Sequence, residues 1–183
     1  NLYILIEKAY NNWKNRCKEI IISRFTLNPQ TNKYDYNGNL KRRDLKFFVS
    51  EDKKGFTINF GEVTGDFDCS NLGLKSLKGS PQKVGVNFDC DNNELTSLEG
   101  APQKIGRAFC CRNNQLTSLE GAPQKVKFFI CSKNKLTTLK GAPQKIGVSF
   151  DCDNNELTSL EGAPQIVKYD FSCRNNKLTT LKG

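Results

Sequence analysis

The sequence has no histidine and no methionine among its 183 residues, and it has a single tryptophan. Its eight cysteines include no Cys-x-x-Cys pair, so the residue types and the spacing of a zinc site are both missing. No apolar run approaches the length of a membrane span, and no segment has the form of a signal peptide. We therefore expect no metal, no cofactor and no membrane association, and we expect the reduced thiols of a cytosolic protein.

The residue groups that mark catalytic sites are also missing. The chain shows no paired cysteine and histidine, no carboxylate dyad and no phosphate-binding loop, so we do not expect an enzyme. The net charge of +9 is spread over the chain, with 12 basic and 7 acidic residues in 1–62 and 16 and 12 in 63–183. The densest basic run, residues 41–43, is followed at once by Asp44, which is more typical of a solvated face than of a nucleic-acid site.

The last two thirds of the chain repeat one pattern six times, beginning at Phe67. The pattern is Phe-x-Cys-x-x-Asn-x-Leu-x-Ser/Thr-Leu-x-Gly-x-Pro-x-x-Val/Ile, and it recurs every 21 residues with one interval of 20. A fixed period of this length is typical of a solenoid, in which each coil buries its apolar side against the next. We therefore predict a mainly β solenoid of six repeats over residues 63–183, truncated at its C-terminal end.

Within each coil, the phenylalanine and the cysteine two residues later point to the same side of a strand. We expect both to fill the core, where a thiol behaves as a small hydrophobic group. These cysteines are Cys69, Cys90, Cys111, Cys131, Cys152 and Cys173. The asparagine three residues after the cysteine ends the strand, and its amide is expected to bond backbone groups of the neighbouring coil. These asparagines are Asn93, Asn114, Asn134, Asn155 and Asn176. Glycine and proline exclude a helix from the return segment, so the convex side should be extended.

Residues 1–62 lack the pattern and are expected to form a capping region with one helix and short strands. Apolar residues recur at helical spacing over residues 2–20, which predicts an amphipathic helix. We interpret this stripe as a lid packed on the first coil, with a partner-binding helix as the alternative. Period-two alternation follows from Arg24, and Leu40 and Leu45 keep the spacing of the inward leucines. Residues 34–62 are therefore interpreted as a degenerate first repeat.

These residues resemble the short bacterial leucine-rich repeat, Leu-x-x-Leu-x-Leu-x-x-Asn-x-Leu, with Phe and Cys in the second and third leucine places. The repeat motif also resembles that of repeat proteins encoded by tailed bacteriophages and prophages. This motif is Phe-x-Cys-x-x-Asn-x-Leu-Thr-Ser-Leu-x-Gly-Ala-Pro-Gln-x-Val. The similarity extends over residues 13–183 and is interrupted at residues 40–58, where that family has a clearer first repeat. It implies a parallel-stranded horseshoe and a phage origin, and it says little about activity.

In a leucine-rich repeat, the strand residues that are not used for the core face the concave side. In the middle coils Cys110, Phe128 and Ile130 stand where other coils have polar residues, and Asp-x-Asp pairs lie on either side. An apolar centre with a charged rim is typical of a protein-binding surface. The candidate partner-binding residues are Asp89, Asp91, Cys110, Arg112, Phe128, Ile130, Asp151, Asp153 and Arg174.

Two alternatives stay open for these positions. Phe128 lies in the coil that is one residue shorter, and the alternative is that its side chain enters the core. The Asp-x-Asp pairs offer oxygen ligands for calcium, although they lie three coils apart with nothing between them to complete a site. The acidic rim favours a basic or mixed-charge protein over nucleic acid. On the opposite edge Lys83, Lys104, Lys125 and Lys145 form a ladder, which we interpret as a solvated face rather than an anion-binding strip.

The favoured function is a non-catalytic module of phage origin that binds a host or phage protein, in the cytoplasm of an infected bacterium, through its concave face. One alternative is a virion or assembly component that docks through the open strand edge of its last coil. A less favoured alternative is the substrate-recognition half of a ubiquitin-ligase-type effector.

Overall fold

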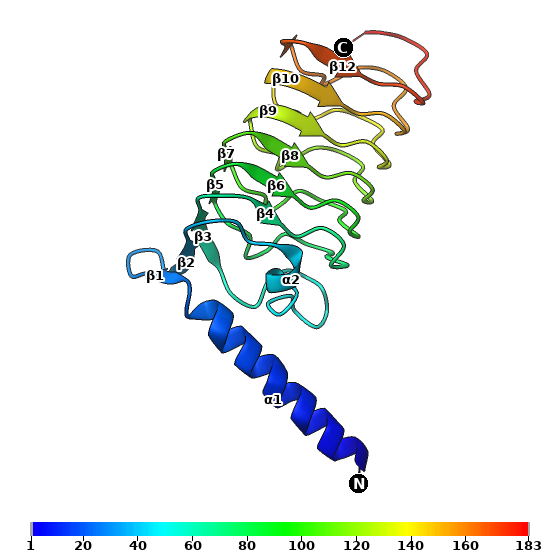
Figure 1. Cartoon of the computed structure of the whole chain (residues 1–183). Coiled ribbons are helices and arrows are strands. Elements are labelled where there is room, and N and C mark those ends of the chain that lie inside the picture. Colours follow the sequence, from blue (N-terminus) through cyan, green and yellow to red (C-terminus); the bar gives the residue numbers. More distant parts are fainter. Residues whose placement is uncertain (1, 183) are drawn as a thin grey trace.

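The chain folds into a mainly β structure, a parallel β-solenoid with a long helix at its N-terminal end (Figure 1). The structure is a computed structural model that describes residues 2–182. The helices are α1 (Leu2–Ile22) and α2 (Arg42–Leu45). The strands are β1 (Thr26–Asn28), β2 (Lys33–Tyr36), β3 (Phe60–Val63), β4 (Phe67–Asp68), β5 (Lys83–Val84), β6 (Asn87–Asp89), β7 (Lys104–Ile105), β8 (Ala108–Cys110), β9 (Lys125–Ile130), β10 (Lys145–Asp151), β11 (Ile166–Val167) and β12 (Asp170–Ser172).

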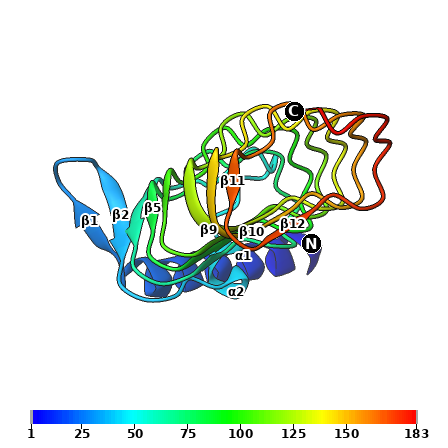
Figure 2. The ribbon, with the colours of Figure 1, turned by 90° about the horizontal axis from the view of Figure 1, so that it is seen from above.

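Two sheets follow the stack of coils. The long sheet has the order β11-β10-β9-β8-β6-β4, with β12 also paired to β10, and all of its pairs are parallel. The edge sheet has the order β1-β2-β3-β5-β7, and only its β1–β2 pair is antiparallel. Figure 2 looks down the stack and shows the coils superposed, with the β1–β2 hairpin at one corner. The strands β5 and β7 come from Lys-Val and Lys-Ile dipeptides, for which the repeat pattern predicts only an extended segment.

The core is a column of identical side chains. Phe67, Phe88, Phe109, Phe129 and Phe150 are at most 1% exposed and stack coil upon coil, with ring centroids 5.5 Å apart for Phe67 and Phe88. The thiols lie beside them. Cys69, Cys90, Cys111, Cys131 and Cys152 are fully buried, and Cys173 in the last coil is half-buried. Each buried thiol donates a hydrogen bond to a carbonyl of the following coil, as Cys90 Sγ does to Cys110 O at 3.2 Å. The column therefore behaves as predicted from the repeat.

The repeated asparagine joins neighbouring coils through the backbone. Asn114 is 4% exposed, and its Nδ2 donates to the carbonyls of Cys90 in the preceding coil and Cys111 in its own, at 3.0 and 3.2 Å. Its Oδ1 accepts from the Leu95 amide of the preceding coil at 3.0 Å. Four other asparagines make the equivalent bonds: Asn93, Asn134, Asn155 and Asn176. The backbone groups at this turn thus find partners that the strand ladder does not supply.

A second asparagine, one residue earlier in each coil, serves a conformational role. Asn92 and Asn113 have φ of +55° and +53°, in the left-handed region that asparagine tolerates better than most residues. Asn113 Nδ2 also donates to Asn92 Oδ1 at 2.8 Å. The fourth coil has Lys133 at this position, with φ of +57°. The ladder of asparagine side chains is therefore interrupted there by a residue that is strained in this conformation.

Replacing Lys133 by asparagine should stabilise the protein. The change Lys133→Asn relieves part of the left-handed strain, and we expect the free energy of unfolding to rise by about 1 kcal/mol. Urea denaturation measures the difference. Lys135→Asn is the matched control, because Lys135 is also exposed and has no positive φ. An equal effect of both changes would remove backbone conformation as the explanation.

The prediction that α1 forms a lid on the first coil is wrong for most of its length. Only Ile21 of the helix is buried, while Leu5, Ile6 and Ile20 are at least 59% exposed. Figure 1 shows α1 leaving the end of the stack at an angle. Trp13 reaches the capping region through an edge contact with Phe47 at 5.8 Å.

The first coil is instead closed by aromatic residues that follow α1. Phe48, Phe56 and Phe60 are buried, and Phe56 and Phe60 pack edge-on against Phe67 at 5.7 and 5.3 Å. Leu40 is fully buried and pairs in parallel with Phe67. These side chains cover the apolar end of the column, which leaves little for a helix to cover.

Candidate functional site

The outward face of the long sheet carries the residues predicted to bind a partner. We call it the sheet face, and it consists of the strand residues that alternate with the buried phenylalanine and cysteine in β4, β6, β8, β9, β10 and β12. The register aligns equivalent residues of successive coils, such as Asp89 with Cys110 and Cys110 with Ile130. Side chains that are 20 or 21 residues apart in the sequence therefore lie side by side on this face.

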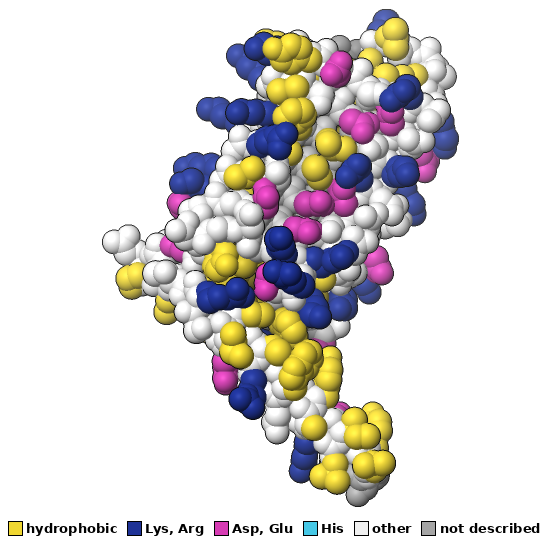
Figure 3. All heavy atoms as spheres, in the orientation of Figure 1, with side chains coloured by type: hydrophobic (Ala, Val, Ile, Leu, Met, Phe, Trp, Pro, Cys, Tyr) yellow, Lys and Arg dark blue, Asp and Glu magenta, His cyan; other side chains and the backbone are white. Residues whose placement is uncertain are grey.

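The structure places four apolar side chains together at its centre. Ala108 lies opposite Phe128, and Cys110 opposite Ile130, and all four are half-buried. Phe128 does not enter the column, because the missing residue of this coil falls before it and Phe129 occupies the stack. Arg107 covers the Phe128 ring, with its guanidinium carbon 5.4 Å from the centroid. We call Cys110, Phe128 and Ile130 the apolar patch. Figure 3 shows hydrophobic side chains on this face, interrupted by charged ones.

The Cys110 thiol contributes to the patch as an uncharged group. Burial raises its pKa to about 12, and the negative charges of Asp91 and Asp89 act in the same direction. The thiol is therefore protonated at neutral pH and is a poor nucleophile, since only the thiolate is reactive. Its contribution to the face is that of a small hydrophobic side chain.

Asp91 and Asp153 do not offer free carboxylates, contrary to the expectation from the sequence. They are 4% and 9% exposed, and each is bonded by the arginine of the following coil. Asp91 accepts from the backbone amide and Nε of Arg112 at 2.6 and 2.7 Å. Asp153 accepts from the same two groups of Arg174 at 2.7 and 3.0 Å. The acidic rim is thus neutralised at these positions, which removes the argument for a basic partner and for calcium.

Hydrogen bonds also set the pKa of Asp153. Burial opposes its ionisation, but the bonds from Ser172 and Arg174 outweigh burial and hold its pKa below the ordinary value.

The sequence contained the signal for both ion pairs. In a parallel stack with a 21-residue period, residue i lies beside residue i+21, so Asp91 with Arg112 and Asp153 with Arg174 form two pairs of the same type.

Asp89 and Asp151 remain on the sheet face, where both are half-buried. Asp89 accepts from the Asp91 amide at 2.9 Å. Burial nevertheless raises the pKa of Asp89 to about 6, with a further contribution from the charges of Asp91 and Asp68. Asp151 Oδ2 accepts from the Ser132 hydroxyl at 3.0 Å. Asp89 therefore changes its charge near pH 6.

The Asp89→Asn variant should reveal this ionisation in the pH dependence of stability. The folded pKa of Asp89 lies above its unfolded value, so its stabilising contribution is complete below pH 4 and is lost as pH rises through 6. The side chain is partly exposed, so we expect the variant to be more stable than the native chain by about 1 kcal/mol at pH 8, with little difference at pH 4. Denaturant unfolding across this range tests it. A difference that does not vary with pH would contradict the shifted ionisation.

Comparisons with family models, curated proteins and solved structures find no match to this chain. Within residues 2–182 no three His, Cys, Asp or Glu side chains are grouped so that they could hold a metal ion. Neither α1 nor α2, the helices of the described residues, combines the length and hydrophobicity of a transmembrane span.

Proposed function

We propose that the chain is a leucine-rich-repeat-type binding module that engages a protein through the sheet face. The observation that carries the proposal is the apolar patch, in which Cys110, Phe128 and Ile130 stand half-exposed where the flanking coils present polar side chains. Large apolar side chains with a polar surround form the energetic centre of many protein interfaces. The Arg107 side chain over Phe128 adds a donor group at its edge. The phage origin and the action inside an infected bacterium belong to the same proposal. They are supported by the amino-acid sequence of the repeat, which resembles that of repeat proteins encoded by phages and prophages.

Two substitutions test the role of the patch. Phe128→Asp and Ile130→Asp each place a charge at its centre, and we expect each to abolish partner capture while circular dichroism stays unchanged. Tagged native and variant chains would be purified from phage-infected bacteria, and the proteins that co-purify would be compared by mass spectrometry. Thr117→Asp, on an exposed turn, is the matched control and should retain the partner. A set of co-purifying proteins that is the same in all four chains would exclude the patch.

The alternative proposal is a structural component that docks through its last coil. The observation in its favour is the apolar surface there, where Ile166 and Leu181 are 53% and 77% exposed. Mass spectrometry of purified phage particles separates the two proposals, because a virion component is present in the particles and an intracellular binding module is not.

A further inference from the structure

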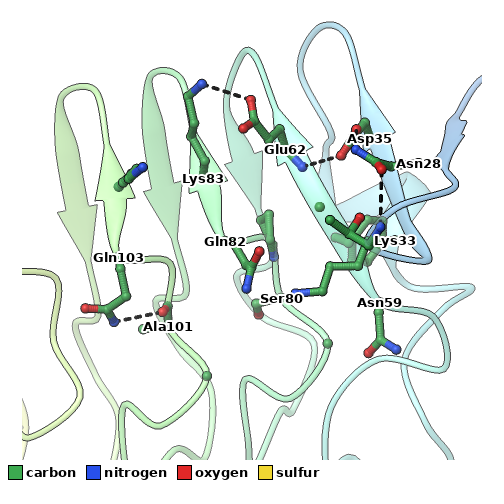
Figure 4. A pocket seen from close by; sticks show the side chains of 17 residues that line it. Asn28, Lys33, Asp35, Asn59, Glu62, Ser80, Gln82, Lys83, Ala101 and Gln103 are labelled. Carbon is green, nitrogen blue, oxygen red and sulfur yellow. Dashed lines mark hydrogen bonds and ion pairs between the residues drawn. The ribbon is translucent and has the colours of Figure 1, made fainter.

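A pocket lies along the edge sheet, between the β1–β2 hairpin and the turns before β5 and β7, away from the sheet face. Its volume is about 540 Å³, and its walls come from the hairpin, from β3 and from the turns that precede β5 and β7. Most of the lining residues have polar or charged side chains, among them Lys33, Lys83 and Lys104. Figure 4 shows Lys33 extending from the hairpin toward Ser80 and Gln82.

Ser80 places a hydroxyl in this lining that has no partner. The residue is 8% exposed, and its Oγ is a buried polar atom without a hydrogen bond among residues 2–182. Buried hydroxyls normally have a partner, because leaving one unsatisfied costs free energy. Ser80 is also a departure from the repeat. The following coils have alanine at this position, namely Ala101, Ala122, Ala142 and Ala163. The hydroxyl therefore occurs in the first full coil, at a turn that lines the pocket.

The Gln82 side chain also differs from the glutamine side chains at the same position of the later coils. Gln103 Nε2 donates to the carbonyls of Ala101 and Gly121 at 3.0 and 3.1 Å, and Gln124 bonds its own coil and the next in the same way. The Gln82 side chain makes none of these bonds within residues 2–182. Its amide is therefore available at the pocket wall, beside Ser80 in Figure 4.

The charges of the pocket favour an anion. Its two carboxylates are already engaged, since Asp35 Oδ1 accepts from the Glu62 amide at 2.7 Å and Glu62 forms an ion pair with Lys83 at 2.8 Å. Lys33 is half-buried, and no carboxylate of residues 2–182 lies within 4 Å of its ammonium group. An ammonium, an amide and a hydroxyl thus line the same pocket as donors. Oxyanions accept bonds from this combination of groups.

We propose that this pocket binds the oxyanion, phosphate or carboxylate, of a small polar molecule. Lys33 neutralises the charge, and Ser80 and Gln82 donate hydrogen bonds to its oxygens. The site does not depend on the proposed partner-binding function, because it lies on another face and shares no residue with the apolar patch.

Titration of the full chain with inorganic phosphate or acetate tests the proposal. Binding is read by thermal shift and by the Gln82 side-chain amide signals in nitrogen-15 NMR, against sodium chloride at equal ionic strength. We expect a saturable response to one anion or both, and the more effective anion identifies the ligand class. Ser80→Ala introduces the residue of the other coils and should fold. We expect it and Lys33→Gln each to weaken binding about tenfold, the loss typical of one charge-assisted bond.

Lys125→Gln is the control, because Lys125 is an exposed lysine that belongs to the ladder of Lys83 and Lys104 but lies outside the pocket. It should bind like the native chain. The proposal is overturned if neither anion gives a response beyond chloride, or if the Ser80 and Lys33 variants bind as tightly as the control.

Discussion

Replacing Phe129 by alanine should lower the free energy of unfolding by about 3–5 kcal/mol, the range for deleting a buried phenylalanine side chain. Phe129 is fully buried, and its ring stacks on Phe109 at 5.2 Å and on Phe150 at 5.6 Å. The deletion therefore removes two ring contacts and leaves a cavity inside a column that neighbouring coils cannot close. Because each coil contacts only its neighbours, the loss also uncouples the coils on either side.

The adjacent residue supplies the control. Phe128 lies on the same strand and points to the opposite side, where it is half-exposed and covered by Arg107. We expect Phe128→Ala to cost less than about 1 kcal/mol, because little buried volume is lost. Denaturant unfolding of both variants measures the contrast. Equal costs for the two changes would show that strand β9 does not present Phe129 inward and Phe128 outward.

Replacing Asn114 by alanine should cost about 3–4 kcal/mol, although the side chain is small and polar. The change leaves the buried amide of Leu95 without its acceptor and removes the bonds to the carbonyls of Cys90 and Cys111. Asn114→Asp should also be strongly destabilising. An aspartate can accept from Leu95, but it brings a charge against two carbonyl oxygens in a buried site.

Asn113→Gly is the matched control for this experiment. Asn113 is the preceding asparagine, it is exposed, and its φ of +53° suits glycine. We expect its replacement to change stability by less than about 1 kcal/mol, through loss of the exposed bond to Asn92. Equal losses of stability from Asn114→Ala and Asn113→Gly would contradict the role assigned to Asn114.

The interior of the solenoid could be predicted because the 21-residue period of the coils is visible in the amino-acid sequence. Residues that recur every 21 positions with one chemical character must meet in a stack, so the burial of Phe109, Cys111 and Asn114 follows from spacing alone. The edge strands β5 and β7 were not predicted, because two residues are too short a segment to show alternation. The direction of Phe128 depended on where the shorter coil loses its residue, which the pattern leaves open.

The outward face and the capping region depend on contacts that the period does not encode. Asp91 and Arg112 lie in different coils, and their pairing appears only when the coil register is applied to outward positions as well as inward ones. The stripe on α1 indicates an amphipathic helix but does not say what it contacts. In the structure the aromatic residues after it already cover the first coil, so most of α1 stays exposed. The pocket beside Ser80 forms between a hairpin without the repeat and the edge of the repeat.

The central claim is that the repeated thiols lie in a dry column, and alkylation of the native chain tests it most directly. Cys69, Cys90, Cys111, Cys131 and Cys152 are buried, whereas Cys17 on α1 is partly exposed. Burial raises the pKa of Cys90 and Cys111 well above the ordinary value, which further suppresses their reaction. Brief treatment with N-ethylmaleimide, followed by peptide mass spectrometry, should label Cys17 and leave these five unmodified until the chain is unfolded. Labelling of the five at the rate of Cys17 in the folded protein would contradict the stacked-coil structure.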